Sequence, residues 1–68
     1  MKIPMLYRLA HAALLENASG GKLTAWEFRR VVGRTMNIRS RDAMALLSEM
    51  KEMRLVGYDP ASMVVRVL

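Results

Sequence analysis

The segment from Thr24 to Val56 has the pattern of two capped helices joined by a tight turn. Thr24 and Glu27 form a capping-box sequence, in which each side chain can accept a hydrogen bond from the backbone amide of the other residue. Leu23 and Phe28 flank this start and can pack on each other as a hydrophobic staple. We therefore expect a helix to begin at residue 25, and its start sets the register of the residues that follow.

Gly33 lies inside this first predicted helix. A glycine in a helix interior costs about 1 kcal/mol relative to alanine, so it indicates either a helix end or a close backbone approach. If the helix ended at Gly33, the apolar residues after it would lie in a loop with no reason for their spacing. We therefore expect the helix to cover residues 25–36, with Asn37 in the left-handed conformation after its end. Its apolar stripe consists of Phe28, Val32 and Met36.

Arginines are concentrated around the predicted turn. Arg30 and Arg34 lie four residues apart on a ridge that faces water. Trp26 is on the same side of the helix as Arg30, and we expect it to cover the edge of a small sheet, although it could also stack on the Arg30 guanidinium or contact a partner. The five arginines are Arg29, Arg30, Arg34, Arg39 and Arg41.

The second predicted helix covers residues 41–54. Ser40 is suited to the N-cap, and Asp42 complements the positive end of the helix. The apolar spacing predicts a buried stripe of Ala43, Leu46, Leu47, Met50 and Met53. The opposite face then presents Arg41, Met44, Ala45 and Ser48 to the outside.

An earlier helix is predicted over about residues 4–18. Pro4 suits a first helical position, and the residues Ser19, Gly20 and Gly21 stop the helix. Lys22 and Leu23 could then form a strand of two or three residues. The expected buried stripe of this helix is Leu6, Leu9, Ala10, Ala13 and Leu14.

A second apolar face on this helix suggests self-association. Tyr7, His11 and Leu15 lie off the main stripe, and surplus apolar surface often forms an interface. We expect a homodimer through this face. His11 has no second ligand at i+4, so a metal role is not expected.

A β-hairpin over residues 55–68 completes the chain. Two β-prone runs, 55–58 and 63–68, are separated by a turn in which Pro60 suits the second position. The turn offers Asp59 and no Lys or Arg, which leaves Arg66 as the only cation on the strands.

The two helices around the turn resemble a helix-turn-helix motif. That family places an aliphatic residue and a small one in its first helix, Gly or Asn in the turn, and a small residue and a leucine in its second helix. The resemblance implies that Gly33 and Ala43 are small because the helices cross there. Many members of the family have a polar pair that begins with Ser at the start of the second helix, whereas this chain has Arg39 followed by Ser40. The first residue of the second helix is therefore uncertain by one position. The matching residues are Val32, Gly33, Met36, Asn37, Ile38, Ala43 and Leu46.

The order of elements resembles the winged-helix family over nearly the whole chain. That resemblance implies one domain over residues 1–68, mainly α with a small β-hairpin, as a three-helix bundle with a short β-wing. It also implies a DNA-binding protein, either a small transcriptional regulator or a chromatin-associated factor. A hairpin that only seals the core explains a wing without Lys or Arg at its tip equally well.

In such a protein the helix over 41–54 would read the major groove of double-stranded DNA. One cation, a small hydroxyl and short apolar groups suit guanine, phosphate and thymine methyl contacts. Glu49 and Glu52 would repel phosphates, so only the first half of the helix should approach DNA, although these residues could also mark a solvated surface. We expect base contacts from Arg41, Met44, Ala45 and Ser48, and phosphate contacts from Lys22, Arg30, Arg34, Arg39 and Ser40.

Composition agrees with a polyanionic partner. Eleven Lys and Arg against six Asp and Glu give a net charge of +5 and a pI near 10.5. The alternative is a winged-helix protein-interaction module of a larger transcription, replication or membrane-remodelling assembly. Three features favour that alternative: the acidic end of the helix over 41–54, a wing tip without Lys or Arg, and Trp26.

Several other classes are not expected. With one histidine, no cysteine and no phosphate-binding loop, we expect no enzyme, no cofactor and no small-molecule substrate. The absence of cysteine leaves no disulfide or thiolate zinc site. No apolar run approaches the roughly 20 residues of a membrane span, and Met1–Pro4 is too short for a signal peptide. We expect a cytoplasmic protein without a membrane partner, associated with the nucleoid if it is prokaryotic.

Overall fold

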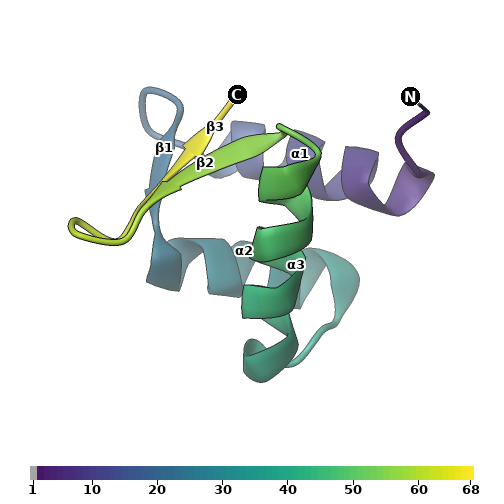
Figure 1. The fold of residues 1–68 in the computed structure, drawn as a ribbon. Coiled ribbons are helices and arrows are strands. Elements are labelled where there is room, and N and C mark those ends of the chain that lie inside the picture. Colours follow the sequence, from purple (N-terminus) through teal and green to yellow (C-terminus); the bar gives the residue numbers. More distant parts are fainter. Residues whose placement is uncertain (1) are drawn as a thin grey trace.

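The computed structural model describes residues 2–68 and shows an α+β fold of three helices and one small antiparallel sheet (Figure 1). The sheet has three strands in the order β1-β3-β2 and packs beside the helices. This layout is compatible with a winged helix. The elements are α1 (Met5–Asn17), β1 (Lys22–Thr24), α2 (Ala25–Met36), α3 (Ser40–Glu52), β2 (Val56–Asp59) and β3 (Val64–Val67).

The core lies between the three helices and the inner face of the sheet. The strands contribute alternate residues to it, because successive side chains of a strand point to opposite faces. Within residues 2–68, fourteen apolar residues are buried, and all of them except Ala25 belong to one continuous core. They are Ala10, Leu14, Leu23, Ala25, Phe28, Val31, Val32, Ala43, Leu46, Leu47, Met50, Val56, Val65 and Val67.

Helix α1 is rotated relative to the prediction. Ala10 and Leu14 are fully buried as expected, but Leu6 and Leu9 are 53% and 55% exposed, so their predicted place in the buried stripe was wrong. Tyr7 packs against the core instead. The reason is that α1 carries apolar residues on almost every side, so spacing alone does not select the buried face.

A two-residue turn connects α1 to the sheet. Gly20 and Gly21 both have positive φ, 60° and 77°, as a type I′ turn requires, and glycine adopts this conformation without strain. Ser19 and Lys22 exchange backbone hydrogen bonds across the turn. The short strand predicted at Lys22 forms, and it pairs with β3.

Helix α2 begins and ends as predicted. Thr24 Oγ1 accepts from the Glu27 amide at 3.0 Å, and the Glu27 carboxylate accepts from the Thr24 amide at 2.9 Å. The hydrogen bond from the Thr24 amide, and then one from the Thr24 side chain, hold the pKa of the Glu27 carboxyl below its ordinary value. Asn37 follows the last turn with φ 53°, so the predicted left-handed conformation is confirmed.

Helix α3 is shifted from its predicted bounds. It starts at Ser40, and its N-cap is Arg39, which makes no side-chain capping bond; the predicted N-cap at Ser40 was one residue late. It ends at Glu52 rather than 54, because the chain turns into a Schellman motif. The Leu55 amide bonds to the Met50 carbonyl, and the Arg54 amide bonds to that of Lys51.

No helix within residues 2–68 combines the length and the apolar character that a bilayer span requires.

Candidate nucleic-acid interface

The outer face of α3 carries the four predicted base-facing residues. Arg41, Met44, Ala45 and Ser48 are all exposed, and their spacing places them on one face, opposite the buried stripe that begins at Ala43. The four side chains are mixed in character: one guanidinium, one hydroxyl and two apolar groups. This face can form both hydrogen bonds and apolar contacts with base edges.

Trp26 and Arg30 stack on each other at the start of α2. The Arg30 Cζ atom lies 4.9 Å from the centroid of the Trp26 ring, within the range of a cation–π contact. The Trp26 side chain remains 58% exposed, and the alternative in which it stacks on the Arg30 guanidinium is confirmed. The indole supports the guanidinium on the surface and remains accessible to a partner.

A shallow hollow joins this pair to the start of α3. It has a volume of about 230 Å³ and is lined by Trp26, Arg29, Arg30 and Ser40. The first turn of α3 has no side-chain cap, and the free amides of a helix N-terminus favour an anion. Two guanidinium groups, a hydroxyl and a helix N-terminus therefore converge where a phosphate could bind.

Arg29 was not predicted as a contact residue. It is partly buried and lines the hollow, and its Nε is buried without a hydrogen-bond partner among residues 2–68. A buried guanidinium donor without a partner is costly and calls for an acceptor. In the sequence, the position of Arg29 was the signal for this role, because Arg29 directly follows Phe28 and so lies at the edge of the buried stripe.

The remaining predicted phosphate contacts of α2 and the turn are exposed. Arg34 lines a neighbouring hollow of about 120 Å³ that Trp26 and Arg30 also line. Arg39 is exposed at the N-cap of α3. Residues 28–41 contain no Asp or Glu, so the turn between α2 and α3 is positive, with Glu27 and Asp42 as the acidic residues at its margins.

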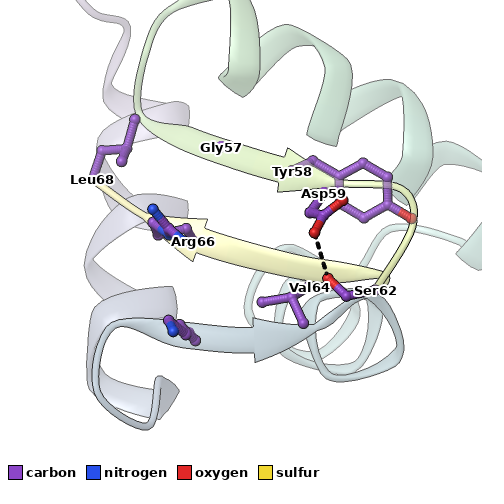
Figure 2. Close-up of a pocket in the computed structure, with 8 residues that line it drawn as sticks. Gly57, Tyr58, Asp59, Ser62, Val64, Arg66 and Leu68 are labelled. Atoms are coloured by element: carbon purple, nitrogen blue, oxygen red, sulfur yellow. Dashed lines mark hydrogen bonds between the residues drawn. The ribbon is translucent and has the colours of Figure 1, made fainter.

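Lys22 and Arg66 lie on a different surface. They are opposite partners in the β1–β3 pair, and both line a hollow of about 530 Å³ on the outer face of the sheet, together with Asp59 and Ser62 (Figure 2). No residue of α2 or α3 is among those that line it. The structure therefore does not bring Lys22 together with the arginines of the turn.

The tip of the wing is organised by Asp59. Its carboxylate accepts a hydrogen bond from the Ser62 hydroxyl at 2.8 Å (Figure 2). It also accepts one from the Ala61 amide at 3.1 Å. The Ser62 bond and then the Ala61 bond hold the pKa of Asp59 below its ordinary value. The wing tip therefore presents a carboxylate that is already used within the turn.

Two of the three residues of the predicted dimer face of α1, Tyr7 and His11, are only partly exposed and are hydrogen-bonded within the chain. Tyr7 donates to Glu49, and His11 Nε2 lies 2.9 Å from the carbonyl oxygen of Leu68. Since a carbonyl only accepts, Nε2 carries the proton in that bond. Of the three predicted residues only Leu15 is well exposed, at 49%. Within residues 2–68 no three His, Asp or Glu side chains are grouped to hold a metal ion.

Searches against protein-family models, curated proteins and solved structures find no match. The assignment of the fold therefore depends on the arrangement of its helices and strands, and the candidate interface depends on its geometry and charge.

Proposed function

We propose that this protein binds double-stranded DNA through α2 and α3, as a winged helix-turn-helix protein with the outer face of α3 in the major groove. The observation that carries the proposal is the hollow between α2 and α3, where Arg29 and Arg30 flank Ser40 and the uncapped start of α3. Phosphate is the anion that such a site suits best, because backbone amides and guanidinium groups both bind its oxygens.

The proposed contacts divide into two classes. Arg41, Met44, Ala45 and Ser48 would meet base edges, since an α-helix fits the major groove and its first turns approach the bases. Arg29, Arg30, Arg34, Arg39 and Ser40 would hold phosphates and fix the register without reading sequence.

The second half of α3 is proposed to stay away from the duplex. Glu49 accepts the hydrogen bond from Tyr7 and so is directed toward α1, and Glu52 is the last residue of the helix. Two carboxylates in this half would repel phosphates. The proposed biological role is that of a small transcriptional regulator or chromatin-associated factor in the cytoplasm.

A duplex titration across salt concentrations tests the proposal. We expect affinity to fall as salt rises, with a log–log slope of about −0.9 per neutralised phosphate. An Arg30→Ala, Arg41→Ala double variant should bind about tenfold or more weakly and show a shallower slope. A Lys22→Ala, Arg66→Ala double variant loses the same charge from the outer face of the sheet and serves as the matched control.

The matched pair separates a specific interface from a merely basic protein. If the two double variants lose affinity equally, net charge and not the α2–α3 surface accounts for binding. If the native protein does not bind a duplex at low salt, the proposal is wrong.

A protein-interaction module is the second candidate function. The observation in its favour is the exposed Trp26 ring, because tryptophan and arginine are enriched among the residues that dominate protein interfaces. Failure to bind DNA together with a stable protein complex that Trp26→Ala disrupts would support it.

A further inference from the structure

The outer face of α1 combines exposed apolar side chains with two charged ones, and no other element within residues 2–68 covers it. Met5 is 63% exposed, and Leu9 and Leu15 are each about half exposed, although the opposite side of the same helix is buried in the core. Large apolar side chains on the outer side of a helix whose inner side is already buried favour a second packing contact. Something of matching shape and charge is needed to cover this face.

The charges on this face identify its partner. Arg8, Ala12 and Glu16 are exposed and follow one another at intervals of four, so they form a single ridge along α1. The ridge is positive at one end, small in the middle and negative at the other end. Such a ridge complements a second copy of itself that runs in the opposite direction.

The direction of these charges opposes the dipole of α1 itself. Arg8 is in the first turn, which has no acidic residue, and Glu16 is in the last turn, which has no basic residue. A cation near a helix N-terminus and an anion near its C-terminus are both unfavourable. In an antiparallel pair, however, each charge lies beside the oppositely charged end of the partner helix, so the arrangement becomes favourable.

We infer that two copies of this chain associate through α1, antiparallel about a two-fold axis at Ala12. Arg8 of each copy then faces Glu16 of the other, and Ala12 lets the helices approach closely. Packing of i±4 ridges, the commonest mode of helix contact, crosses the helices at about 50° and allows this pairing. The exposed Leu9 and Leu15 flank the ridge and close the contact. This interface replaces the predicted one at Tyr7 and His11.

A parallel pair is disfavoured by the same residues. It would place Arg8 against Arg8 and Glu16 against Glu16, and like charges brought together across an interface oppose association. The inference does not depend on DNA binding, because none of these residues belongs to the α2–α3 surface.

Charge-reversal variants studied by sedimentation test the inference. The native chain should dimerise in the micromolar to sub-millimolar range. Arg8→Glu alone and Glu16→Arg alone should each weaken self-association by about tenfold or more, because each brings like charges together. A one-to-one mixture of the two variants should recover a dimer, since every contact then joins opposite charges. The Arg8→Glu, Glu16→Arg double variant should dimerise as the native chain does.

Unfolding of the single variants cannot account for a loss of the dimer. Both single variants place charges that agree with the dipole of α1, so the monomer should keep or gain thermal stability. Arg66→Glu, on the outer face of the sheet, makes the same charge change elsewhere and should leave the dimer intact. The inference is overturned by a native chain that stays monomeric, by single variants that still dimerise, or by a mixture that does not recover the dimer.

Discussion

The Tyr7 hydroxyl in α1 donates a hydrogen bond to the Glu49 carboxylate in α3, across 42 residues of sequence. It links the first helix to the proposed DNA-binding helix near the end of the latter. The hydrogen bond, then desolvation and the negative charge of Glu49, raise the pKa of Tyr7 above its ordinary value of 10. The neutral phenol is therefore favoured in the folded protein.

This relationship predicts a loss of stability in alkali. A group whose pKa is raised by folding contributes stability that is complete below its unfolded pKa, here about 10, and that is lost as pH rises through the folded pKa. Between pH 8, below the titration of an unfolded tyrosine, and pH 11, above it, the free energy of unfolding in denaturant should decrease less for Tyr7→Phe than for the native chain. An identical decrease in both proteins would exclude the Tyr7–Glu49 bond as a cause.

Gly33 is predicted to tolerate a side chain. A Cβ at this position would lie 3.6 Å from the nearest atom, the carbonyl oxygen of Ile38, which is an ordinary contact. The expectation that Gly33 must be small for the helix crossing is therefore not supported by the geometry. Gly33→Ala should raise the free energy of unfolding by up to about 1 kcal/mol through helix propensity. If Gly33→Ala instead lowers the free energy of unfolding by heat or urea, then Gly33 must be small because the two helices cross there.

Arg54 adopts a conformation that suits glycine. Its φ of 61° lies in the left-handed region, at the position after α3 where most Schellman motifs have glycine. Arg54→Gly should therefore stabilise the protein by about 1 kcal/mol. Arg54→Ala removes the same charge but keeps a Cβ, so it should give no such gain. Equal effects of the two substitutions on urea unfolding would attribute the change to charge rather than to backbone strain.

The ends of the helices were predictable where a side chain or a tolerant residue specifies them. Thr24 and Glu27 fix the start of α2, and Asn37 fixes its end, because each provides a local interaction that needs no tertiary context. The end of α3 was missed by two residues since Arg54, not glycine, occupies the left-handed position. Local chemistry there opposes the conformation that the fold imposes.

The rotation of α1 and part of the candidate site could not be read from the sequence. Apolar residues surround α1, so its buried side is set by packing against other elements, including the bonds of Tyr7 and His11. The exposed face of α3 could be predicted, because the apolar residues of this helix recur on one side with a clear helical period. Arg29 was missed because its importance depends on how closely Ser40 approaches it, which is a distance between two helices.

The most direct test of the proposed interface is a map of the residues that contact DNA. In a titration of isotopically labelled protein with a duplex at low salt, we expect the largest amide shifts at residues 39–48 and at Arg29 and Arg30. The outer face of the sheet around Lys22 and Arg66 should change little. The absence of shifts, or shifts confined to that sheet face or to α1, would contradict the account.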